Sequence, residues 1–286
     1  MSQDKKALTE PKSIDEKEVI ETIKTIGFIG TGLIGSALAR LSVAAGFNVI
    51  LSNSRGTESL NPLIEELGSS AKAGSNIDET ISASDIVIAP LPLEYYKILP
   101  TEKLAGKIVI DTMNYYPTDD FHIKELDDAQ FTSSELVQQH LKDSKVVKAF
   151  HNVGFHHLFT DARPKSDPER TTIPIAGDND YAKQVVANLI AALGYDTIDT
   201  GSLKESWRIE PGTPIYYYPY APEIPKEISD EEAREIYLEQ KVNPISIEEA
   251  KKLVDEATRK FPIGGRMDLL PNAHISAFIE FTKKRF

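Results

Sequence analysis

Short apolar runs alternate with amphipathic segments along the N-terminal two thirds of the chain. The first run, Ile26–Gly30, is followed by a helical pattern over Leu33–Gly46 and a second apolar run over Phe47–Ser52. Two further apolar runs are Asp85–Leu91 and Gly106–Thr112. Strands buried on both faces read as continuous apolar runs, and helices connect parallel neighbours. The pattern therefore predicts a doubly wound, mostly parallel α/β sheet of the Rossmann type.

Helical and strand periodicity also predicts the elements between and after these runs. Thr132 and Glu135 stand at the spacing of a capping box, which marks the start of a helix. The remaining predicted elements are helices over Ser59–Leu67, Ile77–Ala83 and Thr132–Leu141, a short strand around Ala71, a strand over Lys145–Phe150, and a strand–helix–strand unit over Thr172–Thr200.

The regular pattern breaks up after Gly201, where Pro and Tyr become frequent. Two acidic helices are then expected over Ser229–Glu239 and Ser246–Lys260. The chain is accordingly divided into four parts: an N-terminal arm (1–23), a dinucleotide-binding Rossmann domain (24–145), a second α/β part that continues the sheet or forms a small lobe (146–210), and a C-terminal helical and irregular extension (211–286).

Composition narrows the function classes. A formal charge of -12 opposes sequence-independent attraction to nucleic acid or to anionic lipid, so neither is expected as a partner. The chain has 0 cysteines, which excludes disulfides, thiolate nucleophiles and iron–sulfur clusters, so redox chemistry must come from a bound cofactor. No signal-peptide core or membrane-spanning run stands out, and a cytoplasmic location is expected.

A glycine-rich turn, Gly30-Thr31-Gly32-Leu33-Ile34-Gly35, lies between the first predicted strand and the first helix. In a dinucleotide site the first glycine permits the tight turn, the second lets the backbone approach the pyrophosphate, and the third lets the helix pack against the strand. The helix N-terminus adds free N–H groups for the phosphates. A turn that binds nothing is the competing interpretation, but the strand–turn–helix context favours a dinucleotide site.

The end of the second strand bears on the choice of cofactor. An NAD-selective site usually presents a carboxylate here, whereas this chain has Asn53, Ser54 and Arg55. Arg55 can form a charge-assisted fork with a 2′-phosphate, Ser54 can donate to it, and Thr31 is close in the turn. The alternative is a surface arginine that happens to follow the strand. The segment favours NADP(H) over NAD(H).

With these residues placed, the chain resembles the NADPH-dependent coenzyme F-420 reductases, also called F-420-dependent NADP oxidoreductases. The resemblance rests on GTGLIGSALA, NSR, VIDTMN, SSEL, VVKAF, and IAGD followed by a helix and GYDTIDTGSL, in order from about Ile26 to Glu210. It implies hydride transfer between NADP(H) and a deazaflavin, and related domains reduce flavins or iron in membrane reductases.

The resemblance also implies roles for individual residues. It assigns the turn from Gly30 to Gly35 to the pyrophosphate, and Thr31, Ser54 and Arg55 to the 2′-phosphate. It places four residues at the end of the fourth strand beside the nicotinamide ribose: Ala89, Pro90, Leu91 and Pro92. The two prolines could instead simply terminate the strand. Asn114, after the next strand, could orient a ligand or cap a turn.

The chain departs from the family pattern after KAF, where the family usually has an Asn-Thr pair and this chain has His151 and Asn152. These two residues are the candidate catalytic groups, and His151 is the first candidate if the acceptor ring needs a proton. His151, His156 and His157 share one loop without a carboxylate pair, so no metal site is predicted.

The leading hypothesis is an NADPH-dependent oxidoreductase that transfers hydride to a deazaflavin or flavin-like acceptor, a small molecule. Trp207 and Tyr216–Tyr218 could wall such an aromatic ring, although plain core is the commoner role of an aromatic cluster. A non-catalytic NADP(H)-sensing protein and a dehydrogenase or reductase of a small hydroxy acid or imine are the alternatives. A homodimer is expected because the extension needs a surface to pack on.

Overall fold

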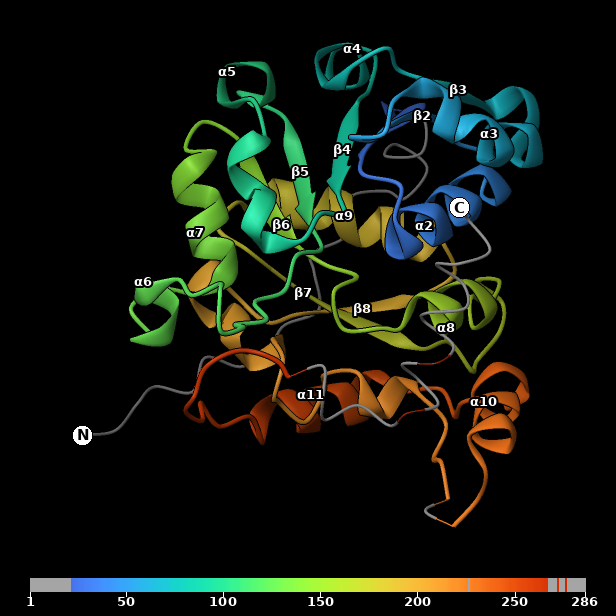
Figure 1. Cartoon of the computed structure of the whole chain (residues 1–286), viewed down its shortest axis with the longest axis vertical. Coiled ribbons are helices and arrows are strands. Elements are labelled where there is room, and N and C mark those ends of the chain that lie inside the picture. The colour runs from blue at the N-terminus through green and yellow to red at the C-terminus, as the bar shows by residue number, and fades with distance from the viewer. Residues whose placement is uncertain (1–21, 226, 267–271, 273–275, 277–286) are drawn as a thin grey trace.

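The computed structural model describes residues 22–225, 227–266, 272 and 276. Apart from residues 22 and 23, the N-terminal arm expected at 1–23 lies outside these residues. The polypeptide forms one eight-stranded sheet in the order β3-β2-β1-β4-β5-β6-β7-β8 (Figure 1). The strands are β1 (Thr25–Ile29), β2 (Asn48–Ser52), β3 (Ala71–Ala73), β4 (Ile86–Ala89), β5 (Ile108–Asp111), β6 (Lys145–Lys148), β7 (Thr172–Gly177) and β8 (Asp196–Asp199).

The six strands from β1 to β6 are parallel, β7 is antiparallel to β6, and β8 is parallel to β7. This confirms the predicted doubly wound, mostly parallel α/β class. Strands β7 and β8 lie in the same sheet as the Rossmann strands and do not form a separate layer. The carboxyl ends of β1, β2, β4, β5 and β6 therefore lie along one edge, where ligands bind in folds of this kind.

Helices cover both faces of the sheet (Figure 1). Their bounds are α2 (Leu33–Ala44), α3 (Asn61–Leu67), α4 (Ile77–Ser82), α5 (Thr101–Leu104), α6 (Lys124–Asp127), α7 (Ser133–His140), α8 (Phe155–Thr160), α9 (Asp180–Ala192), α10 (Asp230–Glu239) and α11 (Ile247–Asp255). Short 3₁₀ turns occupy Leu93–Ile98 and Leu203–Ile209, among others. No helix among the described residues is long and apolar enough to cross a membrane.

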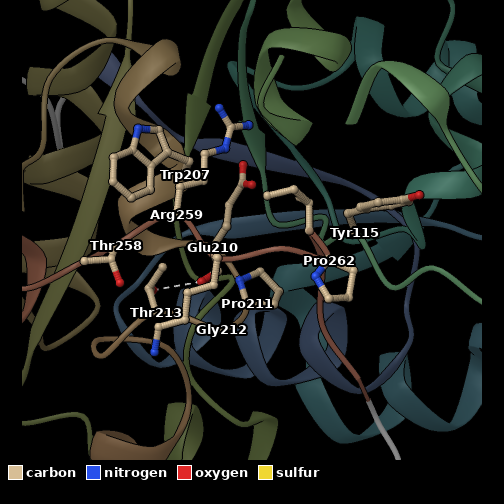
Figure 2. A pocket seen from close by; sticks show the side chains of 12 residues that line it. Tyr115, Trp207, Glu210, Pro211, Gly212, Thr213, Thr258, Arg259 and Pro262 are labelled. Atoms are coloured by element: carbon tan, nitrogen blue, oxygen red, sulfur yellow. Dashed lines mark hydrogen bonds between the residues drawn. The ribbon is translucent and has the colours of Figure 1, made fainter. Parts of the chain in front are cut away.

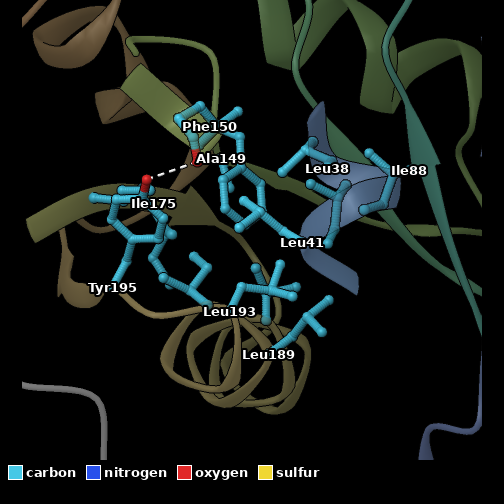
Figure 3. Packing of buried hydrophobic residues seen from close by; sticks show 14 of the residues in the cluster. Leu38, Leu41, Ile88, Ala149, Phe150, Ile175, Leu189, Leu193 and Tyr195 are labelled. Atoms are coloured by element: carbon cyan, nitrogen blue, oxygen red, sulfur yellow. Dashed lines mark hydrogen bonds between the residues drawn. The ribbon is translucent and has the colours of Figure 1, made fainter. Parts of the chain in front are cut away.

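Side-chain alternation along the central strands divides the core into two layers. In β4, Ile86 and Ile88 belong to one apolar cluster, whereas Val87 and Ala89 belong to the other. The first cluster packs under α2, α8, α9 and α11, and the second packs under α4, α5 and α7. Figure 3 shows the first layer, where Leu38 and Leu41 of α2 face Phe150, and Leu189 and Leu193 lie beneath. A strand buried on both faces explains the unbroken apolar runs of the sequence.

Local sequence signals set several helix boundaries. The Thr132 side chain accepts from the Glu135 backbone and Glu135 reaches back to the Thr132 N–H, which confirms the predicted capping box at the start of α7. Ser229 caps α10 in the same way. The prediction that the last helix reaches Lys260 was wrong, because α11 ends at Asp255. Ala257 is the last apolar residue of the predicted range, and the three residues that follow it are polar.

The C-terminal extension packs against the sheet. The Ile245 carbonyl accepts from the Thr172 N–H at 2.9 Å, and the Tyr220 hydroxyl donates to the Thr172 carbonyl at 2.9 Å. Farther on, the Gly265 N–H donates to the Tyr115 carbonyl at 2.8 Å. The extension thus reaches from β7 to the segment that follows β5, at the carboxyl edge of the sheet.

Candidate functional site

The three glycines of the turn after β1 have different surroundings. Gly30 adopts φ 119°, a conformation that side chains rarely tolerate, and a Cβ there would lie 2.8 Å from the Pro90 carbonyl oxygen. A Cβ on Gly35 would overlap the Gly30 carbonyl oxygen, so helix and strand can pack this closely only with glycine. A Cβ on Gly32 would meet nothing within 4 Å. The three positions thus match the turn, helix-packing and phosphate-approach roles of a dinucleotide site.

The N-terminus of α2 opens directly from this turn. Gly32 is its N-cap and provides no side-chain acceptor, and the first turn of the helix contains no acidic residue. The first N–H groups, including those of Leu33 and Ile34, therefore keep their hydrogen-bonding capacity for a ligand. The Ser36 hydroxyl donates to the Thr31 carbonyl at 3.1 Å and holds the turn from within. The residues fit the pyrophosphate of a dinucleotide.

Asn53 connects the loop after β2 to the glycine turn. Its Nδ2 donates to the Thr31 hydroxyl at 3.0 Å and to the Ser59 hydroxyl at 2.9 Å, while its Oδ1 accepts from the Arg55 N–H at 2.9 Å. We call Asn53, Ser54 and Arg55 the bracket. Ser54 and Arg55 are exposed, and no carboxylate occupies the end of β2. The loop therefore presents a hydroxyl and a guanidinium beside the turn, which suits a 2′-phosphate.

The fourth strand ends behind the glycine turn. Ala89 is its last residue and is fully buried, and Pro90, Leu91 and Pro92 follow it. The space beside Gly30 and Gly35 is closed by Pro90, through its carbonyl oxygen and its ring. These residues line the carboxyl edge between the turn and β5, where a nicotinamide ribose would extend. The ribose contacts themselves stay a prediction.

Asn114 joins three segments at the end of β5. Its Nδ2 donates to the His151 carbonyl at 2.8 Å and to the Tyr216 hydroxyl at 3.1 Å. The Tyr216 hydroxyl is also hydrogen-bonded to the Tyr116 hydroxyl. Asn114 therefore does more than cap a local turn: it connects the edges of β5 and β6 to the tyrosine-rich segment of the extension.

His151 and Asn152 turn inward after β6. Phe150, just before them, adopts φ 58°, a left-handed conformation that is rare for a bulky residue and redirects the chain into the protein. His151 is 5% exposed, and its Nε2 hydrogen-bonds the Ile209 carbonyl at 2.7 Å. The Asn152 carbonyl accepts from the Tyr217 N–H at 3.0 Å. Asn152 thus anchors the tyrosine-rich segment.

Protonation states at this edge are set mainly by burial. Burial lowers the pKa of His151 well below its usual value, and the nearby Lys148 lowers it further, although the hydrogen bond to Ile209 opposes the shift. His151 is neutral at physiological pH, which disfavours the proton-donor role considered for it. Burial likewise raises the pKa of Tyr216 well above its ordinary value. Tyr216 therefore keeps its hydroxyl proton.

A buried ionic network behind the edge was not predicted from the sequence. Lys148, fully buried, donates to the Met113 carbonyl at 2.7 Å and lies 3.6 Å from an Asp111 oxygen. Ser133 links Lys148, at 3.1 Å, to Glu210, at 2.8 Å. A lysine inside the apolar run KVVKAF is the signal that could have indicated it, since buried charges are normally paired. The network fixes β5, β6 and α7 relative to the segment that ends at Glu210.

The extension also lines one side of an open cavity of about 150 Å³ next to this edge. Figure 2 shows Trp207, Glu210 and Arg259 gathered on one side, and Tyr115 and Pro262 on the other. Ligand pockets usually measure about 300–1,000 Å³, so this cavity is large enough for only part of a flavin-like ring. A complete ring would need the surrounding segments to move.

Several known proteins resemble part of this chain. The sequence profile of the family described as "NADP oxidoreductase coenzyme F420-dependent" matches residues 25–115. Metalloreductase STEAP3 of Rattus norvegicus is 28% identical over 197 residues, which cover 68% of this chain and 37% of that protein. The F420-dependent NADP reductase of Methanocaldococcus jannaschii is 37% identical over 139 residues, 46% of this chain and 60% of that protein.

Among solved structures, a hypothetical protein from Sinorhizobium meliloti is similar, with 30% identity and a TM-score of 0.60. The match covers 70% of this chain and 96% of the other. The chain spans less than two thirds of the length of the two curated relatives. The family profile spans the glycine turn and the carboxyl edge of the sheet up to Tyr115.

Proposed function

The chain belongs to the coenzyme F-420-dependent NADP oxidoreductase family, and on this premise we propose that it oxidises NADPH by hydride transfer to a deazaflavin or flavin-like ring. The observation that carries the proposal is the pairing of an open Gly32 with the bracket of Asn53, Ser54 and Arg55. The first leaves space for a pyrophosphate and the second presents positive charge and hydroxyls where NAD-selective sites have a carboxylate.

The residues of the chain divide the work of binding and orientation. The turn from Gly30 to Gly35 and the N-terminus of α2 would hold the pyrophosphate, and Ser54 and Arg55 the 2′-phosphate. Pro90 fixes the turn from behind, since it closes the space beside Gly30 and Gly35. When bound, the nicotinamide supplies the hydride, so the protein needs mainly to align two rings and exclude water.

The acceptor ring would bind where the extension meets the carboxyl edge of the sheet. Trp207, Tyr115 and Pro211 provide apolar surface at the cavity there. Because the cavity of about 150 Å³ is small, acceptor binding must displace part of the extension. The neighbouring His151 is neutral and buried, so the proton that accompanies the hydride comes from another donor or from solvent.

Steady-state oxidation of NADPH tests the proposal. The full chain is mixed with NADPH and, separately, with a deazaflavin, FMN, FAD or riboflavin, and the nicotinamide absorbance is followed. Turnover with at least one of these rings, faster with NADPH than with NADH, is the expected result. Tight NADPH binding without turnover in any of the four mixtures would overturn the proposal and favour an NADP(H)-sensing protein.

A further inference from the structure

Four residues from distant parts of the chain form a polar cluster at the carboxyl edge: Asn114, Tyr116, His151 and Tyr216. Asn114 contacts both the His151 carbonyl and the Tyr216 hydroxyl, and the two tyrosine hydroxyls contact each other. The His151 and Tyr216 rings lie 6.5 Å apart between centroids. We call these residues the edge cluster.

Two acceptor atoms of the edge cluster are buried without a hydrogen-bond partner among the described residues: Asn114 Oδ1 and His151 Nδ1. Their roles follow from their neighbours. A carbonyl oxygen can only accept, so Asn114 must direct Nδ2 to the His151 carbonyl, which leaves Oδ1 unused. For the same reason His151 carries its proton on Nε2, against the Ile209 carbonyl, and Nδ1 keeps a bare lone pair.

The edge cluster also has one donor to offer. A hydroxyl has one proton and two acceptor lone pairs. Asn114 Nδ2 donates to the Tyr216 oxygen. Either tyrosine hydroxyl can donate in the contact between Tyr116 and Tyr216, and in the arrangement where Tyr116 donates, both lone pairs of the Tyr216 oxygen are filled. The proton of Tyr216 is then available to a ligand. Burial raises the pKa of Tyr216, so this proton stays in place at neutral pH.

Two buried acceptors are costly unless a donor fills them, by about 1–3 kcal/mol each in general. Two acceptors and one donor are the complement of a primary carboxamide, whose NH₂ group donates twice and whose carbonyl accepts. We propose that the edge cluster binds the carboxamide of the nicotinamide ring, with Asn114 Oδ1 and His151 Nδ1 accepting from its NH₂ and Tyr216 donating to its carbonyl. This inference rests on the proposed NADP(H) function.

The position along the sheet agrees with this assignment. Asn114 follows β5, which pairs with β4, which in turn pairs with β1 and its glycine turn. A dinucleotide whose pyrophosphate lies over the turn extends its nicotinamide in this direction along the edge. Both acceptors are buried in this structure, so entry of the amide requires a local rearrangement of the residues around the edge cluster. The imide edge of a flavin has only one N–H between two carbonyls and complements the cluster less well.

The test compares the binding of two oxidised cofactors to the full chain: NADP⁺ and its 3-acetylpyridine analogue, in which a methyl group replaces the NH₂. The single tryptophan, Trp207, lies in this part of the protein, and its fluorescence reports binding. The wild type is expected to bind NADP⁺ about 10- to 100-fold more tightly than the analogue, because the analogue leaves both acceptors unfilled.

Variants test separately the two acceptors, Asn114 and His151, and the donor, Tyr216. Asn114→Ala and His151→Phe should each reduce this preference about 10-fold. Tyr216→Phe should weaken NADP⁺ and the analogue equally, since both keep the carbonyl. Tyr181→Phe, on the surface of α9, is the matched control and should change neither affinity. Circular dichroism and thermal melting verify folding, and a variant that fails to fold is replaced by the conservative Asn114→Ser or His151→Gln.

Equal affinity of the wild type for NADP⁺ and the analogue would overturn the inference and leave the proposed function standing. So would a preference that survives in every variant. Discrimination between riboflavin and 3-methylriboflavin, with no discrimination between the two cofactors, would assign the amide to the acceptor and also overturn it. Absence of NADP⁺ binding altogether would overturn the proposed function together with this inference.

Discussion

The glycine turn and the edge cluster lie on the same edge of one sheet but are assembled in opposite ways. In the turn, Asn53 contacts Thr31 from 22 positions away, across one strand–helix–strand unit. In the edge cluster, Asn114 contacts Tyr216 from 102 positions away, across most of the domain. The first region depends on local backbone requirements and the second on distant segments packed together. Substitutions should therefore affect the two regions differently.

The largest effect is expected within the turn itself. Gly35→Ala places a Cβ against the Gly30 carbonyl oxygen, so the helix must move away from the strand, and the loss in unfolding free energy should be about 1–3 kcal/mol. Gly32→Ala meets open space and should leave stability unchanged while weakening NADPH binding at the crowded pyrophosphate. Thermal melting and NADPH titration of both variants give the comparison. Equal destabilisation by the two substitutions would contradict the assigned roles.

Cofactor selectivity should depend on the bracket after β2. Arg55→Ala removes the charge offered to the 2′-phosphate and should weaken NADPH about 10- to 100-fold, with little effect on NADH, which lacks this phosphate. Fluorescence titration with both cofactors measures the ratio. Ser59→Ala, which removes a hydroxyl that contacts Asn53, is a control for indirect loosening of the bracket. If Arg55→Ala weakened NADPH and NADH binding by the same factor, the assignment of Arg55 to the 2′-phosphate would be wrong.

The edge cluster should make stability depend on pH. Burial holds the pKa of His151 below its usual value of about 6.5, so the unfolded chain binds this proton more readily than the folded one. Stability is then lost as the pH falls below about 6.5, by up to about 1.4 kcal/mol per pH unit for this one group. The slope should shrink in His151→Phe, measured by urea unfolding between pH 5 and pH 8. It should persist in His122→Gln, whose histidine is exposed.

The smallest effect should come from the cap of α7. Thr132→Ala removes the side-chain acceptor of the capping box and a hydrogen bond to the Leu203 carbonyl at 2.9 Å. The expected loss is about 1 kcal/mol in unfolding free energy, with NADPH affinity unchanged. Ser229→Ala, at the exposed cap of α10, is the matched variant and should cost less, because the Ser229 hydroxyl contacts only Glu232 of the same cap and no distant segment. A change in NADPH affinity in Thr132→Ala would contradict this prediction, because it would show that α7 affects the cofactor site.

The contrast between the regions also explains what the sequence could predict. Apolar runs and the spacing of Gly30, Gly32 and Gly35 report backbone geometry that is local, so the sheet, its class and the turn could be read from them. The Thr132 capping box is equally local. The pairing of Asn114 with Tyr216 could not be predicted, because nothing in either segment specifies which distant segment it meets. The buried network around Lys148 had only a weak signal in the sequence: a charged residue inside an apolar strand.

His151 shows the same limit in chemical terms. The sequence made it the first candidate for a proton donor if the acceptor ring needs one, because it follows KAF where the family pattern changes. Its protonation state depends on burial and on the Ile209 carbonyl, 58 positions away. This carbonyl accepts a hydrogen bond from the only N–H of the neutral ring. A residue's type indicates which chemistry is available, but its surroundings decide which form is present.

Kinetic analysis with isotopically labelled cofactor tests the central claim most directly. NADPH carrying deuterium at C4 of the nicotinamide ring and ordinary NADPH are each mixed with an excess of the full chain and a deazaflavin or flavin acceptor, and a single turnover is followed. Hydride transfer predicts oxidation of both cofactors, slower for the deuterated one because the C4–D bond is broken. No oxidation, or oxidation at the same rate with either label on the transferred face, would contradict hydride transfer at this site.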